Sequence, residues 1–304
     1  MNPKHLFQKI VSFPVTLLLA LGLAAPLEAG EQFTQEEIAS SPYLQSVLRR
    51  MDERYDTSKF RKKGPYRIAL AAQGTSNSWS ALFDEHAVSY AKELGKEVIE
   101  ELLYADAQAS ADNQIPQVED LLAQEPDALI LVPMGAAALS APVERAMAQG
   151  VPVVLCASAV ETDNFVTEIG TNLYASGAGL AKYLIEKLGG RGNVLMMTGI
   201  PGVSTSDVME AGAKATFKKY PGIKLLDVQP GNWSTAEAKR IMETWLVQHD
   251  RVDGIWSGGA QMSQGIVSAY LDKGAKIPPI GGGEFATGFL RLAIANDLEY
   301  GAWQ

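Results

Sequence analysis

Polar and aromatic side chains recur at the ends of short apolar runs in this 304-residue chain. Asn77 and Trp79 follow the run 67–72, and Trp233 follows the run 224–228. Indole rings can cover the apolar C–H face of a small ligand, while amides, hydroxyls and carboxylates bind its hydroxyl groups. The pattern therefore predicts a site for a small hydroxylated ligand. Its candidate residues are Asn77, Trp79, Ser158, Asp207, Trp233, Gln261 and Glu284.

Most of these candidates also have a purely structural interpretation. Trp79 and Trp233 could be ordinary core or interface aromatics, and Asn77 could cap a helix. Asp207 and Glu284 could be first-turn acids that complement a helix dipole. The repetition of such residues after one apolar run and the next favours the binding interpretation.

Short apolar runs alternate with amphipathic stretches from Pro65 onward. Each unit takes about 25–30 residues, the size of a strand–helix repeat. Continuous Val, Ile and Leu runs suit strands buried on both faces of a sheet, so the sequence predicts an α/β fold with doubly wound parallel sheets. Because about ten strands are many for one open sheet, two lobes are expected. Strands are expected at 67–72, 97–103, 128–132, 153–156, 166–169, 194–198, 224–228, 254–257, 279–281 and from 300; helices are expected near 79–94, 111–124, 136–149, 174–188, 206–219, 235–248, 261–273 and 286–296.

The first 29 residues have the pattern of a secretory signal peptide. Lys4 and Lys9 precede an apolar run from Val11 to Ala24, and a small-residue cleavage site ends at Ala29. The run is shorter than the about 20 residues that a membrane span needs, so no span is expected after cleavage. We interpret residues 30–64 as an N-terminal extension, 65–171 as the first lobe and 172–304 as the second lobe with the start of a second crossover.

Charge and cysteine content exclude several classes of protein. A net charge of −9 argues against nucleic acid or an anionic membrane surface as a partner, because both need a basic face. The single cysteine, Cys156, rules out a disulfide scaffold, and its apolar surroundings in the sequence predict an inert buried thiol. An exported protein without disulfides suggests the periplasm.

No set of residues suited to catalysis is evident in the sequence. His86 and His249 have no second histidine at metal-ligand spacing, and neither a G-x-S-x-G nor a phosphate-binding glycine motif occurs. We therefore expect no enzyme activity, no cofactor and no metal. Gly177-Ala-Gly179 is interpreted as a place of close helix packing, and Gly199-Ile-Pro-Gly202 as a turn.

Several short sequence motifs carry a family resemblance through their order and spacing. They are Asn77-Ser-Trp79, Asp112–Leu122, Pro126–Pro133, Gly150–Val154, Gly170–Asn172 and Gly199–Gly202. With them the chain, from about Tyr66 to Gln304, resembles the periplasmic sugar-binding proteins of the ribose-binding type, the type I solute-binding proteins of ABC importers. The resemblance implies a monomer that closes on a sugar between two lobes joined by three crossovers and delivers it to a membrane permease. It also implies that Thr171 and Asn172 mark the first crossover, and that Gln304 is a polar ligand residue at the second.

The chain departs from this family at its charged ligand residues. Ala157-Ser158 replaces a common Asp-Arg pair, and Asp207 stands where an Arg is common. Guanidinium groups that bind sugar hydroxyls or carboxylates are thus missing. An anionic ligand would meet Asp207 and Glu284 unpaired, so we expect a neutral sugar or polyol, or a ligand with an amine.

Alternatives to a transport receptor remain open. The same fold could present its ligand to a chemoreceptor or a sensor kinase, and an exported α/β enzyme is a further alternative. The core of a lactose-repressor-type regulator would need an N-terminal helix-turn-helix where residues 1–29 stand. Relative to the family, the chain stops before a last helix and strand, so we expect a truncated first lobe with an uncovered apolar face.

Overall fold

The computed structural model describes residues 54–283 and 286–302. The predicted signal peptide at 1–29, residues 30–53 of the predicted extension, and the candidates Glu284 and Gln304 lie outside the described residues. No helix in the described ranges combines the length and apolar character that crossing a membrane requires.

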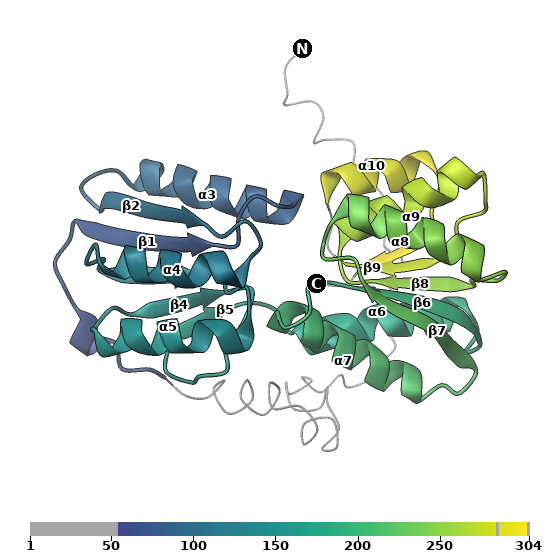
Figure 1. Cartoon of the computed structure of the whole chain (residues 1–304), viewed down its shortest axis with the longest axis horizontal. Coiled ribbons are helices and arrows are strands. Elements are labelled where there is room, and N and C mark those ends of the chain that lie inside the picture. Colours follow the sequence, from purple (N-terminus) through teal and green to yellow (C-terminus); the bar gives the residue numbers. More distant parts are fainter. Residues whose placement is uncertain (1–53, 284–285, 303–304) are drawn as a thin grey trace, which may run out of the picture.

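The first lobe is built on a parallel sheet whose strand order is β2-β1-β3-β4-β5 (Figure 1). Its central strands carry Val, Ile, Leu and Ala in unbroken runs, as strands buried on both faces require. The strands are β1 (Tyr66–Ala72), β2 (Ile99–Asp106), β3 (Ala128–Leu131), β4 (Val153–Cys156) and β5 (Thr167–Ile169); the helices are α3 (Ser78–Leu94), α4 (Ala111–Leu122) and α5 (Ala136–Ala148).

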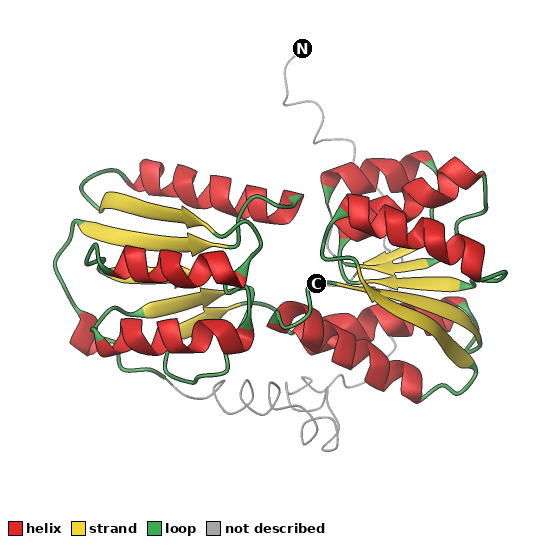
Figure 2. Cartoon of the chain, in the orientation of Figure 1, coloured by secondary structure: helices red, strands yellow, loops and turns green. Residues whose placement is uncertain are grey.

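The second lobe repeats this plan with the order β10-β9-β8-β6-β7, again all parallel (Figure 2). The predicted fold class, two doubly wound parallel α/β lobes, is confirmed. The strands are β6 (Gly192–Thr198), β7 (Ile223–Pro230), β8 (Gly254–Ser257), β9 (Ile280–Gly282) and β10 (Tyr300–Ala302); the helices are α6 (Leu173–Lys187), α7 (Ser204–Lys218), α8 (Thr235–Gln248), α9 (Ala260–Lys273) and α10 (Thr287–Ala295).

The two lobes differ in how their sheets are covered. In the second lobe α6 and α7 enclose one apolar cluster, and α8, α9 and α10 enclose another on the opposite face. In the first lobe a large cluster lies between the sheet and helices α4 and α5. On the other face of that sheet Ile130 and Val154 are only half-buried, and Ile169 is 63% exposed.

Helices α6 and α7 approach each other closely through glycine. A Cβ on Gly177 would collide with the carbonyl oxygen of Met209, and one on Gly212 would collide with that of Tyr174. The interpretation of Gly177 as a close-packing residue is confirmed. The two helices are therefore closely packed, and this packing fixes the positions from which their connecting loops start.

The described chain passes from the first lobe to the second at residues 170–172, between β5 and α6. Asn172 is the N-cap of α6, and its side chain accepts a hydrogen bond from Ala175 N at 3.0 Å. At the other end of the lobe, Phe60 packs against the apolar cluster and Lys62 pairs with Asp127. Residues just before β1 are thus attached to the first lobe.

One buried amide ties the core of the first lobe to its loops. The Gln114 side chain, on α4, is fully buried. Its Nε2 donates to Val132 O at 2.8 Å and to Ala72 O at 3.2 Å, and its Oε1 accepts from Met134 N at 2.8 Å. These backbone groups lie where β1 and β3 end, so Gln114 satisfies them and fixes the starts of both following loops.

Replacing Gln114 with methionine should destabilise the protein by about 2–4 kcal/mol. The apolar side chain has nearly the same shape, but it leaves the buried Met134 N–H and Val132 C=O without partners. Urea unfolding should show this as a lower midpoint. The matched control is Gln124→Met, because the exposed Gln124 side-chain amide, just past the end of α4, bonds only to Asp120 O in the last turn of that helix. Equal midpoints for the two variants would contradict the role given to Gln114.

Candidate functional site

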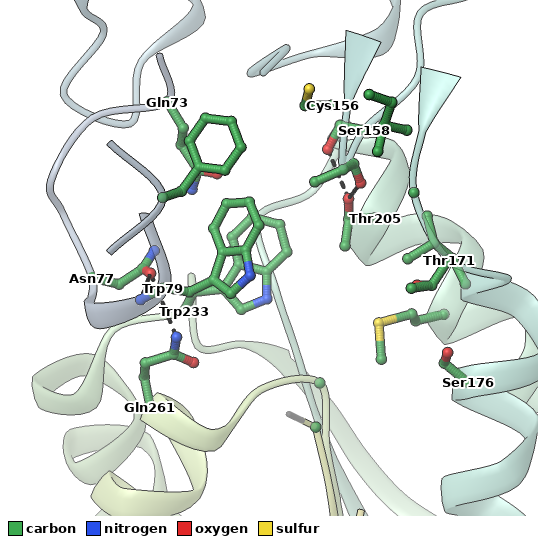
Figure 3. Close-up of a pocket in the computed structure, with 18 residues that line it drawn as sticks. Gln73, Asn77, Trp79, Cys156, Ser158, Thr171, Ser176, Thr205, Trp233 and Gln261 are labelled. Carbon is green, nitrogen blue, oxygen red and sulfur yellow. Dashed lines mark hydrogen bonds between the residues drawn. The ribbon is translucent and has the colours of Figure 1, made fainter. Parts of the chain in front are cut away.

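A cavity of about 460 Å³ lies between the two lobes, at the carboxyl ends of their strands (Figure 3). The first lobe contributes the loop after β1, the start of α3 and the loop after β4. The second lobe contributes α6, α7, the start of α9 and the loops after β7, β8 and β9. The structure brings five of the predicted ligand residues into its wall, together with Thr171 of the predicted hinge. These five are Asn77, Trp79, Ser158, Trp233 and Gln261.

Asn77 is both a helix cap and a cavity residue. Its Oδ1 accepts hydrogen bonds from Trp79 N at 3.0 Å and Ser80 N at 3.1 Å, and Ser80 Oγ accepts from Asn77 N in return. This capping box satisfies N–H groups that the first turn of α3 would leave unpaired. Because Oδ1 is occupied by the helix, Asn77 has only its Nδ2 amino group to offer as a donor to a ligand.

Gln261 meets Asn77 across the gap between the lobes. It lies in the first turn of α9 and is 6% exposed. Its Nε2 donates to Asn77 Oδ1 at 3.4 Å, a long hydrogen bond. Its buried Oε1 has no hydrogen-bond partner among the described residues. A buried carbonyl oxygen left unpaired is costly, and a ligand donor in the cavity would remove that cost.

The two candidate tryptophans enter the cavity from different lobes. Trp79 is 36% exposed and stacks on Phe83, with ring centroids 5.5 Å apart and an interplanar angle of 16°. Trp233 is half-buried and packs against apolar clusters of the second lobe and of the lobe interface. An aromatic face from each lobe is thus available to the same small ligand.

Hydrogen bonds join the lobes at one side of the cavity. Ser158 Oγ and Thr205 Oγ1 are 2.7 Å apart, and Thr205 Oγ1 also donates to Ala157 O at 2.6 Å. Next to them, Ser204 Oγ accepts from Ala159 N at 2.7 Å. The N-terminus of α7 therefore packs against the loop after β4, and the Ser158 hydroxyl already forms a hydrogen bond with Thr205 there.

Four predicted residues are not among the described residues of the cavity wall. Asp207 is exposed and points back to the turn before α7, where its carboxylate accepts from Gly202 N at 3.1 and 3.2 Å. Although the residue as a whole is exposed, partial desolvation of its carboxyl raises the pKa of Asp207, and the hydrogen bond from Gly202 N opposes this rise. Asn172 serves as the cap of α6 and is not part of the described lining. The position of Glu284, next to the lining residue Gly283, is outside the described residues, as is that of Gln304.

Sequence reasoning missed part of the wall. Gln73, 7% exposed, is the first residue after β1, so the strand-end rule could have found it. Thr205 and Ser176 line the cavity from helix starts. The apolar residues Ile169, Leu173 and Met209 also line it, and nothing in their pattern distinguishes them from core residues.

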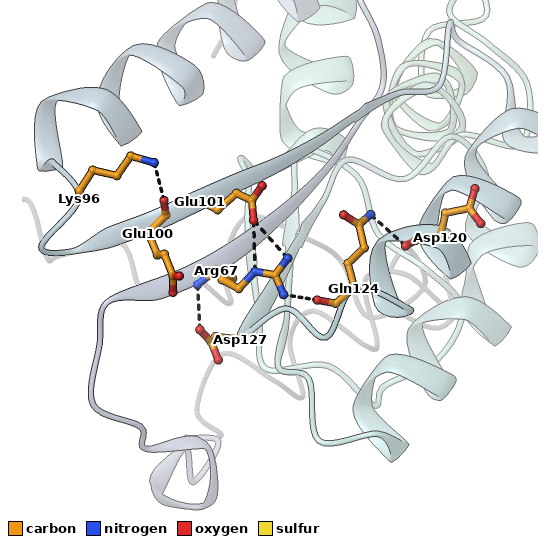
Figure 4. A network of polar contacts seen from close by, with 7 residues as sticks. All are labelled: Arg67, Lys96, Glu100, Glu101, Asp120, Gln124 and Asp127. Carbon is orange, nitrogen blue, oxygen red and sulfur yellow. Dashed lines mark hydrogen bonds and ion pairs between the residues drawn. The ribbon is translucent and has the colours of Figure 1, made fainter.

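The described lining carries no Asp, Glu, Lys, Arg or His, and its only titratable side chain is Cys156. Burial raises the pKa of the Cys156 thiol, so it is protonated and unreactive at neutral pH. Within the described ranges no three His, Cys, Asp or Glu side chains group as metal ligands. Charged residues instead cluster at the opposite edge of the first sheet, where Arg67 binds Glu101 and the carboxylate of Asp127 accepts from Arg67 N (Figure 4).

Two relatives with known binding roles resemble the chain in sequence. The chain is 30% identical over 183 residues to the xylitol-binding protein of Mycolicibacterium smegmatis, an alignment that covers 60% of this chain and 52% of that protein. It is 27% identical over 219 residues to the ribose import binding protein of Bacillus subtilis, covering 72% and 70%. The chain thus spans about half the length of the first of these relatives.

Solved structures share the fold. A galactofuranose binding protein superposes with a TM-score of 0.73 at 22% identity, over 78% of this chain and 81% of that one. A periplasmic solute-binding protein from Actinobacillus succinogenes with bound D-allose gives 0.68 at 25% identity, over 77% and 83%. These relatives and neighbours are binding proteins rather than enzymes. The periplasmic binding protein domain matches residues 68–304, and the chain belongs to this family.

Proposed function

We propose that this chain is an exported solute-binding protein that captures a neutral sugar or polyol between its two lobes and delivers it to an ABC importer. The observation that carries the proposal is the cavity between the lobes, in which Trp79 and Trp233 combine with the amides of Asn77 and Gln261. Family membership and relatives named for ribose and xylitol binding support it. The signal-like residues 1–29 support export to the periplasm.

The lining favours a ligand without net charge. Closure of the lobes would remove water from the cavity, and a buried ion without a partner costs far more than a buried hydroxyl that forms hydrogen bonds. The described wall offers no ionic partner. The apolar stretch formed by Ile169, Leu173 and Met209 further favours a ligand with exposed C–H faces, as sugars and polyols have.

The amides also set the hydrogen-bond pattern that the ligand must match. Asn77 offers a donor because its oxygen caps α3, and Gln261 offers an acceptor because its Oε1 is unpaired. A hydroxyl group can accept from the first and donate to the second at once. A ligand hydroxyl therefore fits this corner, whereas an ether or ketone oxygen, which only accepts, would leave Gln261 Oε1 unpaired.

A thermal-shift screen tests the proposal directly. We expect at least one neutral member of a panel of xylitol, D-ribose, D-allose, D-apiose and myo-inositol to raise the melting temperature. A ligand at about 100 times its Kd adds about 2.7 kcal/mol of stability. D-galacturonate and D-glucuronate serve as charged controls and should give no shift. A shift with the acids alone would contradict a neutral ligand.

Removing either tryptophan should weaken binding without abolishing the fold. Trp79→Ala and Trp233→Ala are each expected to cost about 1–3 kcal/mol of binding free energy, because each removes an aromatic face. Isothermal titration calorimetry with the best ligand of the panel measures the loss. Trp79→Phe keeps a ring and should lose less than Trp79→Ala. Unchanged affinity in both alanine variants would exclude the two-ring arrangement.

Asn77→Asp separates the capping role from the binding role. Aspartate caps a helix as well as asparagine does and suits the positive end of its dipole, so the melting temperature without ligand should not fall. It lacks the Nδ2 donor, so affinity should fall by about tenfold or more. The control is Asn172→Asp, the same change at a cap outside the described lining, which should leave affinity unchanged. Equal affinities for the two variants would show that Asn77 does not bind the ligand.

A further inference from the structure

Trp233 occupies a backbone conformation that bulky residues rarely adopt. Its φ is 51°, and that of Asn232 before it is 54°. Two consecutive non-glycine residues in the left-handed region are sterically costly, and such strain persists only where the surroundings hold it in place. The base of the loop is anchored, since Gly231 N donates to Thr198 O at 2.8 Å and Ser234 N donates to Gly231 O at 2.9 Å.

Two glycines lie against the indole ring. A Cβ on Gly199 would come within 2.5 Å of Trp233 Cζ2 and 2.7 Å of Nε1, closer than Cβ atoms approach other atoms in proteins. A Cβ on Gly259 would lie 3.1 Å from Cδ1, a tight contact, and 3.0 Å from Oε1 of the flexible Gln261 side chain. Gly199 directly follows β6 and Gly259 directly precedes α9, so the ring lies across the ends of two neighbouring strands.

The backbone does not explain why glycine stands at these two places. Neither residue has φ in the left-handed region, and that of Gly259 is −171°, extended backbone that any residue can adopt. Gly202 and Gly274, by contrast, have φ of 80° and 64° with open space around them. At Gly199 the obstacle to a side chain is the indole of Trp233 itself.

We propose that Gly199 and Gly259 are positioning residues that form a slot for the Trp233 ring and thereby fix its place in the cavity. Gly199 contacts the Cε2–Nε1 edge of the ring, and Gly259 contacts its Cδ1 atom. The left-handed backbone at Asn232 and Trp233 sets the direction in which the side chain leaves the loop. Any side chain at Gly199 pushes the ring away from the strand ends. The effect on ligand affinity rests on the proposed function, whereas the slot does not depend on it.

Ring position can be measured without a ligand. The full chain is labelled with 5-fluorotryptophan, and the Trp233 resonance is identified by its absence in Trp233→Phe. Gly199→Ala should shift this fluorine resonance. Gly288→Ala is the matched control, because a Cβ there meets nothing closer than Gln264 Oε1 at 3.6 Å, and it should leave the resonance in place. An unmoved resonance in Gly199→Ala would contradict the proposal that Gly199 positions the Trp233 ring.

Affinity for the panel ligand with the largest thermal shift gives the second measurement. Gly199→Ala should raise the Kd for this ligand by up to about tenfold, which is the equivalent of one aromatic contact. In the Trp233→Ala background the same change should have no further effect, because the ring that it displaces is gone. An equal loss in both backgrounds would overturn the positioning role. If no panel member binds the wild type, the proposed function fails, and the resonance still decides the slot.

Discussion

The architecture depends on one constraint of parallel sheets: every strand must be followed by a segment that returns to the starting edge. All carboxyl ends of a sheet therefore lie at one edge, and every loop that leaves a strand begins there. The two sheets of this protein present these edges to each other. Asn77 and Gln261 are 184 residues apart in sequence and lie within hydrogen-bond distance because each comes shortly after such a strand.

Helix starts supply most of the polar chemistry at this edge. The first N–H groups of a helix have no partner within the helix, so side chains with acceptor atoms gather there. Asn77 satisfies two of these groups and retains an amino group for the cavity. Ser204 and Thr205 at the start of α7 bond instead to the loop after β4 of the other lobe. Folding and lobe docking thus use the same kinds of residue as ligand binding, which is why sequence alone left both interpretations of Asn77 open.

The sequence predicts the strands and most helices well, since continuous Val, Ile and Leu runs such as 128–132 and 153–156 have few other stable placements. It places side chains less well where the outcome depends on a loop's path. Helix α7 begins at Ser204 rather than at 206, and Asp207 turns back to Gly202 instead of facing the cavity. Met209 and Leu173 line the cavity, yet their pattern equals that of core residues. The left-handed Asn232–Trp233 pair follows from tertiary contacts that no local pattern records.

The distribution of charge connects the fold to the proposed ligand. Ion pairs such as Arg67–Glu101 lie at the amino edge of the first sheet, half-exposed, where water screens them and their net contribution is small. In the proposed binding mode, closure of the lobes would leave that edge in water but would desolvate the carboxyl edge. A charged group in the cavity wall would raise the free energy of the closed state unless the ligand neutralised it. With amides, hydroxyls and indoles there instead, closure of the described wall on the proposed neutral ligand would only exchange hydrogen bonds with water for hydrogen bonds with protein.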